Sequence, residues 1–162
     1  MDAPDDPPSA SSGEPTRTEH GTCVAIGETG VLILGPSGAG KSTLALKLIL
    51  DAPRCLPPAE LVADDRVVLE TDGGVLIARP PPLIAGLIEV RGLGIRRLPH
   101  RPKVALAHLV ELGPDAHATR MPNLEALRST LLGFPLHRIG AASPEEAVLL
   151  IAAFLCSADY EN

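Results

Sequence analysis

Aromatic side chains are scarce in this 162-residue chain, which has two phenylalanines, one tyrosine and no tryptophan. With so few rings available, aromatic stacking can contribute little to the binding of any ligand. Basic residues are also in the minority, since 14 Lys and Arg face 20 Asp and Glu, for a formal net charge of -6. This balance, without a stripe of Lys and Arg, argues against a nucleic-acid-binding surface.

The chain also has no apolar run long enough to cross a bilayer. Its start is acidic and rich in proline and serine, which is unlike a signal peptide. The three cysteines, Cys23, Cys55 and Cys156, lack metal-binding or redox spacing, and their odd count predicts no disulfide framework. We therefore expect a cytoplasmic protein without a membrane partner. A hydrophobic content of 45% at this length suits one domain with a sizeable core.

The order of the predicted elements indicates an α/β fold. Residues 1–18 have almost nothing to bury and predict a disordered tail, followed by a single folded domain over residues 19–160. Predicted strands are 22–26, 31–34, 60–63, 67–69, 75–78 and 104–110, and predicted helices are 42–50, 83–87 and 147–156. Ser143-Pro144-Glu145-Glu146 supplies the last of these helices with an N-cap, a proline at the first helical position and a capping-box glutamate. Residues 89–94 read as a loop, and the ambiguous stretch 112–133 suggests a helix around 124–132. Because several strands form antiparallel hairpins, we expect a mixed sheet flanked by helices rather than a simple alternating βαβ array.

Residues 35–42 read Gly-Pro-Ser-Gly-Ala-Gly-Lys-Ser, a complete G-x-x-x-x-G-K-[ST] motif between an apolar strand and a helix. In such a loop, backbone N–H groups and the helix N-terminus hold a phosphate chain. Lys41 is expected to reach the β- and γ-phosphates, and the Ser42 hydroxyl to ligate Mg²⁺. The predicted nucleotide-binding residues are Gly35, Pro36, Ser37, Gly38, Ala39, Gly40, Lys41, Ser42 and Thr43. The motif indicates ATP or another polyphosphate with Mg²⁺, but it does not identify the acceptor.

Two carboxylates, Asp64 and Asp65, end the apolar strand that follows this helix. Because side chains alternate along a strand, the two should point in different directions. One can hold Mg²⁺, and the other can accept a proton from an attacking hydroxyl. An isolated Asp at a strand end is usually a turn former, but a complete phosphate loop upstream favours a functional role.

A third segment, Glu-Val-Arg-Gly-Leu-Gly-Ile at residues 89–95, suggests a loop that approaches a ligand closely. Glu89 would add a metal ligand, and Arg91 would offset charge on a transferring phosphoryl group. Basic residues cluster around this segment, which suggests a phosphate site, an acidic protein partner or only a solvated loop. They are Arg91, Arg96, Arg97, Arg101 and Lys103.

Taken in chain order, the phosphate loop, Val-Ala-Asp-Asp at 62–65 and Ile-Glu-Val-Arg-Gly-Leu-Gly-Ile at 88–95 resemble the catalytic domain of bacterial HPr kinase/phosphorylase. The likeness runs from His20 to about residue 110 and then weakens. It implies a P-loop kinase-like fold, with residues 19–160 as the catalytic domain of a homo-oligomeric serine kinase that regulates the phosphotransferase system. Its protein partner would be an HPr-like phosphocarrier, and its phosphoryl donor ATP with Mg²⁺ or, in some members, pyrophosphate.

The resemblance also assigns roles to single residues. Asp65 would be the catalytic base, Lys41 would keep its role in the loop, and His20 would be the family's histidine upstream of the loop. Arg120 would match a further catalytic arginine. The metal ligands would be Ser42, Asp64 and Glu89.

Two departures from the family pattern bear on the activity. Nothing in the sequence corresponds to the family's common N-terminal domain. The stretch before the last predicted helix, residues 138–146, lacks the Pro-Gly-Arg-Asn-like pattern of members that catalyse phosphorolysis, so we expect a kinase with weak reverse activity. Two other functions remain open: a kinase for a small molecule, and a non-catalytic module that senses nucleotide and binds a signalling partner.

Overall fold

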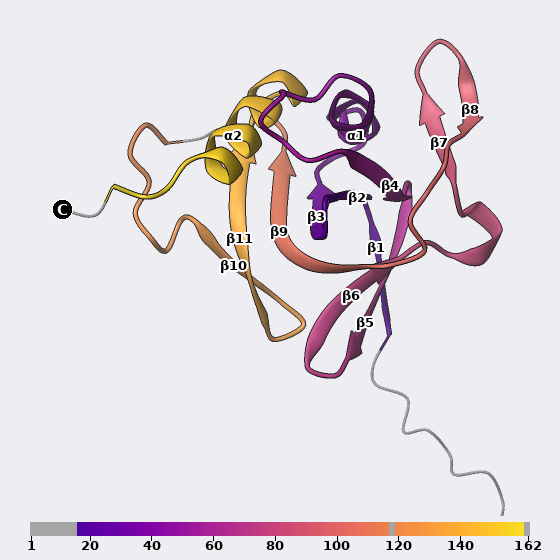
Figure 1. Ribbon diagram of the computed structural model, residues 1–162, viewed down its shortest axis with the longest axis horizontal. Coiled ribbons are helices and arrows are strands. Elements are labelled where there is room, and N and C mark those ends of the chain that lie inside the picture. Colours follow the sequence, from indigo (N-terminus) through magenta and orange to yellow (C-terminus); the bar gives the residue numbers. More distant parts are fainter. Residues whose placement is uncertain (1–15, 117–118, 161–162) are drawn as a thin grey trace, which may run out of the picture.

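The computed structural model describes residues 16–116 and 119–160, which form a curled mixed sheet with two helices on one face (Figure 1). Within these residues the sheet has nine strands, in the order β1-β5-β6-β9-β3-β2-β4, with β11 paired to β9 and β10 paired to β11. β3 and β11 run parallel to β9, and the other pairs are antiparallel. A separate two-stranded sheet, β7–β8, stands beyond α1.

The strands are β1 (Arg17–His20), β2 (Thr22–Ile26), β3 (Thr29–Leu34), β4 (Ala59–Ala63), β5 (Arg66–Asp72), β6 (Val75–Arg79), β7 (Leu87–Val90), β8 (Gly94–Arg97), β9 (Val104–Leu112), β10 (Arg128–Leu131) and β11 (Phe134–Ala141). The helices are α1 (Lys41–Leu50) and α2 (Pro144–Cys156), with one 3-10 turn, η1 (Pro82–Ile84). No helix in the described part of the chain is both long enough and apolar enough to span a membrane.

Two apolar clusters form the core, one on each face of the central strands. β2 shows the division, because Val24 and Ile26 pack under the helices while Cys23 and Ala25 pack against the curled side of the sheet. All five of its residues are buried, as expected for a strand covered on both faces. The cluster under the helices joins α1 and α2 to the carboxyl ends of β3 and β9, where the phosphate loop begins.

The α2 N-terminus is fixed by the capping residues that the sequence predicts. The Ser143 hydroxyl accepts a hydrogen bond from the Glu146 backbone N–H, and the Glu146 carboxylate accepts one from the Ala142 N–H. α1 and α2 lie side by side (Figure 1), and Lys47 Nζ of α1 lies 3.3 Å from Glu145 Oε1 of α2. The mixed α/β architecture expected from the sequence is therefore confirmed.

Four predicted segments differ from the structure. The helix predicted over 83–87 is only the 3-10 turn η1, and Leu87 begins β7. Arg17 and Thr18, assigned to the tail, belong to β1, while residues 1–15 of that tail lie outside the described residues. The predicted loop 89–94 contains the end of β7, a turn and the start of β8. The helix expected around 124–132 is absent there, because residues 128–131 form β10 and pair with β11.

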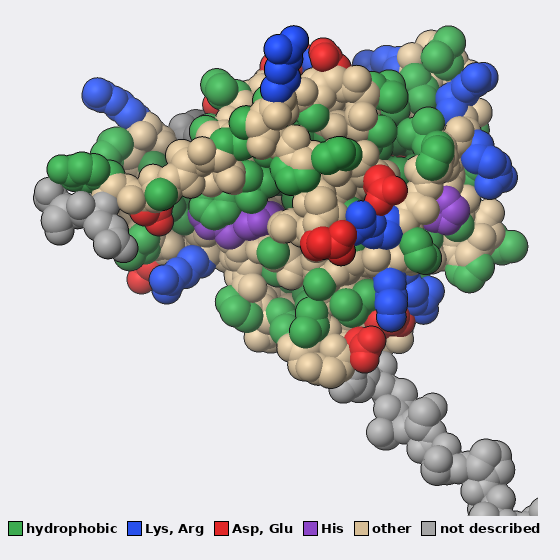
Figure 2. Space-filling model, viewed as in Figure 1, with side chains coloured by type: hydrophobic (Ala, Val, Ile, Leu, Met, Phe, Trp, Pro, Cys, Tyr) green, Lys and Arg blue, Asp and Glu red, His purple; other side chains and the backbone are tan. Residues whose placement is uncertain are grey.

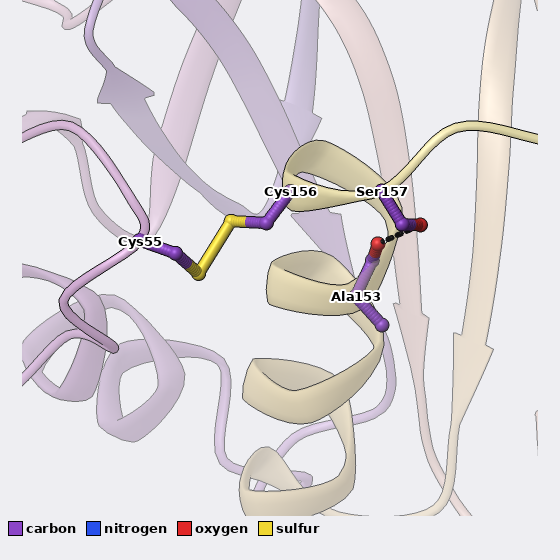
Figure 3. Close-up of a disulfide and its surroundings, with 4 residues drawn as sticks. All are labelled: Cys55, Ala153, Cys156 and Ser157. Carbon is purple, nitrogen blue, oxygen red and sulfur yellow. Dashed lines mark hydrogen bonds between the residues drawn. A yellow bond between two sulfur atoms is a disulfide. The ribbon is translucent and has the colours of Figure 1, made fainter.

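The expectation of no disulfide framework is also wrong, because Cys55 and Cys156 form a disulfide (Figure 3). Cys55 lies in the connection between α1 and β4, and Cys156 is the last residue of α2. The two cysteines are 101 residues apart in sequence, so their spacing gave no local signal. Cys23 is a free thiol in the core.

Candidate active site

The phosphate loop connects β3 to α1, and two of its glycines are required by its geometry. Gly40 precedes α1 with φ of 97°, and a Cβ at this position would lie 2.5 Å from Pro144 Cγ of α2. A Cβ on Gly35 would lie 2.3 Å from the Leu112 carbonyl oxygen. The loop therefore fits closely between β9 and the start of α2, which holds its backbone in place.

Lys41 is the first residue of α1 and is only 9% exposed. Its ammonium group donates hydrogen bonds to the carbonyl oxygens of Gly35 (2.9 Å) and Pro36 (3.1 Å). The cation is thus folded back over the loop, at the position where a phosphate chain held by the loop would meet it.

Asp64, at the end of β4, is the centre of a hydrogen-bond network. It is 6% exposed, and its Oδ1 accepts hydrogen bonds from the hydroxyls of Thr22 (2.7 Å) and Ser42 (2.8 Å). Its Oδ2 accepts one from the Glu89 backbone N–H at 3.1 Å. One buried carboxylate thereby joins β2, α1 and β7, and it holds the Ser42 hydroxyl at the mouth of the phosphate loop.

Asp65 is exposed where Asp64 is buried, and the cause is its backbone conformation rather than strand alternation, because both aspartates follow the last residue of β4. Its side chain is 67% exposed, and its backbone has a φ of 67°, in the left-handed region that Asp tolerates better than most residues. His20 Nε2 lies 3.3 Å from its Oδ1, and Arg66 Nε lies 3.8 Å from its Oδ2. The pairing of β1 with β5 places His20 beside Asp65, because His20 is in register with Arg66, the residue that follows Asp65.

These groups line one cleft of about 260 Å³. Its lining residues are His20, Thr22, Ser37, Gly38, Gly40, Lys41, Ser42, Thr43, Asp64, Asp65, Glu89 and Arg91. The structure thus brings together His20, the loop and the three acidic residues predicted from sequence. Arg120 is exposed in the connection between β9 and β10 and does not line the cleft.

Thr22 is the site residue that the sequence analysis did not single out. It is 1% exposed and donates its hydroxyl to Asp64. Its only signal in the sequence is a hydroxyl beside an apolar strand, just after His20-Gly21, and that signal is weak.

The oxygen atoms around Ser42 fit a magnesium ion. Ser42 Oγ and Asp64 Oδ1 lie 2.8 Å apart, and Glu89 lines the same cleft. Mg²⁺ prefers such oxygen ligands and usually keeps waters and substrate phosphates in the rest of its shell, so it needs few protein groups. The described residues contain no cluster of three or more His, Cys, Asp or Glu that could hold a metal.

Comparison with known proteins gives the family. Residues 14–99, a little over half of the chain, match the family model described as "HPr Serine kinase C-terminal domain". The chain belongs to this family. The HPr serine kinase C-terminal domain family accounts for both the phosphate loop and the acidic strand end, which fall within the matched residues.

Individual relatives agree with this assignment. The chain is 38% identical over 153 residues to the HPr kinase/phosphorylase of Bordetella pertussis, covering 86% of this chain and 47% of that protein. It is 48% identical over 82 residues to the HPr kinase/phosphorylase of a Geobacillus species, covering 50% of this chain and 24% of that protein. The chain thus spans about half the length, or less, of these relatives.

A solved structure supports the fold. The Hpr(Ser) kinase/phosphatase of Coxiella burnetii superposes with a TM-score of 0.65 at 26% identity, covering 86% of this chain and 88% of that one. The P-loop kinase-like fold expected from the sequence is therefore confirmed. The names of the family and of these relatives show that the family is one of kinases and phosphotransferases.

Proposed function

We propose that this chain is a cytoplasmic, ATP-dependent serine kinase that phosphorylates an HPr-like phosphocarrier protein. The observation that carries the proposal is the division of labour in the cleft. Lys41 and the buried Asp64–Ser42 pair stand at the phosphate loop, and the exposed Asp65–His20 pair stands at its mouth. A homo-oligomeric state is part of the same proposal.

In the proposed reaction, Asp65 accepts the proton of the seryl hydroxyl. The seryl oxygen bonds to the γ-phosphorus while the bond from that phosphorus to the β,γ-bridging oxygen breaks, and ADP leaves. Asp65 is exposed, so a hydroxyl on a protein surface can reach it. His20, beside it, positions the carboxylate. Lys41 stabilises the charge that develops on the phosphoryl oxygens. Ser42, Asp64 and Glu89 would hold Mg²⁺, which supplies charge neutralisation on the phosphates when bound.

The pairing of charges near the start of α2 supports the expectation that phosphorolysis is weak. The reverse reaction needs inorganic phosphate held beside a phosphoserine, which calls for positive charge beyond Lys41 and Mg²⁺. Arg138 of β11 is paired with Glu111 of β9, and Glu145 is paired with Lys47. Arg138, in the strand before α2, and Lys47, on the neighbouring helix α1, are therefore already neutralised by carboxylates. Arg91, at the cleft, is the group that would have to replace them.

The direct test is incubation of the protein with Mg²⁺-ATP and an HPr-like carrier from the same organism, with phosphoserine located by mass spectrometry. A carrier whose acceptor Ser is replaced by Ala is the control and should stay unmodified. Pyrophosphate in place of ATP tests the alternative donor. Tight binding of Mg²⁺-ATP without transfer to any carrier would favour the nucleotide-sensing module, and transfer to a sugar or nucleotide would favour the small-molecule kinase.

A further inference from the structure

The β7–β8 hairpin presents one face toward the cleft and the other toward the core. In an antiparallel pair, residues directly opposite each other share a face. Ile88 lies opposite Arg96, and Ile88 is buried in the cluster under the helices. Glu89 lies opposite Ile95, and Glu89 lines the cleft. Arg97, two positions along β8 from Ile95, is therefore on the cleft side as well.

This cleft-side face is positively charged in a chain of net charge -6. Its arginines are Arg91 at the cleft and Arg97 further along β8, and its one carboxylate is Glu89. Both arginines are exposed, and the contact recorded for Arg97 is a 3.3 Å hydrogen bond to the Ala85 carbonyl oxygen. By contrast, nearby Arg101 is held by Glu28 and Glu60. In Figure 2, Lys and Arg side chains gather along the right-hand edge of the molecule, where Figure 1 places β7 and β8.

The same face carries exposed apolar surface. Ile95 is 63% exposed, and Leu93 at the turn is 69% exposed. An exposed apolar side chain next to an uncompensated guanidinium is typical of a protein-contact surface, where Arg and large apolar residues are enriched. Leu93, Ile95 and Arg97 are not among the residues that line the phosphate-loop cleft, so a nucleotide held in the loop does not account for them.

We propose that the cleft-side face of β7–β8, formed by Ile95 and Arg97, docks the protein substrate through a carboxylate that lies beside an apolar side chain on that partner. The inference rests on the proposed function and specifies the acceptor: an acidic protein surface adjacent to the seryl group. Because the face is continuous with the cleft through Glu89, a partner seated on it brings its hydroxyl to Asp65. The negative remainder of the chain repels the same partner elsewhere, which favours this one orientation.

The hairpin offers a matched control. Arg96 and Arg97 are neighbours, both exposed, and they lie on opposite faces. The test compares Arg97→Glu, Ile95→Ser and Arg96→Glu, each checked for unchanged melting and unchanged Kd for Mg²⁺-ATP. Binding of a Ser→Ala carrier is measured by calorimetry at low and high salt, and KM and kcat are measured with the intact carrier.

We expect Arg97→Glu to raise the Kd and KM for the carrier by about tenfold or more, with kcat within about twofold and a weaker salt dependence. Ile95→Ser should raise the same constants with no change in salt dependence, and Arg96→Glu should change them by less than about threefold. Equal effects of the two arginine substitutions, no effect of either, or a wild type that binds no carrier would overturn the docking proposal. So would a change in oligomeric state with Arg97→Glu, since that would assign the face to a second copy of the chain. A carrier that binds through this face but is not phosphorylated would instead overturn the proposed kinase activity.

Discussion

Two neighbouring aspartates illustrate how a change of direction in the backbone separates two tasks. Asp64 ends a strand pointing inward, and three donors from three elements converge on it. Asp65 takes a positive φ, which turns its side chain out to His20 and to solvent. The sequence predicts that the two differ, but the choice between them depends on packing that brings β2, α1 and β7 together.

Replacement of each aspartate by asparagine should therefore give different defects. Asp65→Asn should keep the fold and the Kd for Mg²⁺-ATP, since Asn also tolerates the left-handed region, and should lower kcat by about a hundredfold or more through loss of the proton acceptor. Asp64→Asn should lower the melting temperature and weaken Mg²⁺ binding, because its amide replaces an acceptor at a buried network. Calorimetric titration with Mg²⁺-ATP, melting curves and turnover separate the two. The roles are reversed if Asp64→Asn melts normally and is the less active of the pair.

Lys41→Ala should remove phosphoryl transfer without unfolding the domain. The expected loss in transition-state stabilisation is about 3–4 kcal/mol, a hundredfold or more in rate. Because Lys41 also donates to the carbonyls of Gly35 and Pro36, a small loss of thermal stability should accompany it. Lys47→Ala, on the same helix but outside the cleft, is the matched control. Near wild-type turnover by Lys41→Ala would refute the role assigned to the phosphate loop.

At the scale of the elements, the sequence predicts a helix or strand well when local interactions fix it, and poorly when pairing with another strand decides its structure. β2, α1 and α2 carry local signals, namely an apolar run, a phosphate-loop motif and a capping box, and they form where predicted. Residues 124–132 contain helix-favouring leucines. Residues 128–131 nevertheless form β10, because they pair with β11, which itself runs parallel to β9. The glycines of the β7–β8 turn favour a loop, so the hairpin around them is not predicted. The parallel pairing of β11 with β9 joins segments far apart in the chain and has no local signature.

Two paired strands and α2 also hold a pair of half-buried histidines that should make stability depend on pH. His108 of β9 is in register with His137 of β11, and Phe154 of α2 stacks on His137 with ring centroids 3.7 Å apart. Burial, and then the nearby His137, lowers the pKa of His108 to about 4. Burial also lowers the pKa of His137, with an opposing contribution from Asp159.

The neutral form of these histidines is thus favoured in the folded state. As pH falls from about 6.5 toward 4, the unfolded chain takes up more protons, so the free energy of unfolding decreases over this window. We expect the wild type to lose melting temperature between pH 7.5 and 5, and His108→Leu to lose distinctly less. The exposed His100, changed to Gln, serves as control and should behave like the wild type. Parallel pH profiles for wild type and His108→Leu would contradict this account.

Across the whole molecule, the two helices connect the phosphate loop to the disulfide. The N-terminus of α2 packs against Gly40 and pairs with α1 through Glu145, and its C-terminus is tied through Cys156 to the α1–β4 connection. The link joins residues 101 positions apart in sequence and fastens the end of α2 to the connection that follows α1. Cys23 takes no part, because it is fully buried and burial raises the pKa of its thiol. Thiol–disulfide exchange in the folded protein is therefore confined to the pair itself.

Reduction of this pair should lower stability while leaving the cleft competent. By the chain-entropy estimate, a closure of this length contributes about 4–5 kcal/mol, or roughly 10–20 °C in melting temperature for a chain of this size. The double variant Cys55→Ser/Cys156→Ser should melt like the reduced wild type and should not respond to added reductant. Neither cysteine lines the cleft, so the Kd for Mg²⁺-ATP should be equal in the oxidised and reduced forms below the lower melting temperature. The proposed cytoplasmic location favours the reduced form, because glutathione keeps cytosolic thiols reduced. If the melting temperature does not change once mass spectrometry verifies reduction, the two helices are held by their apolar contacts alone.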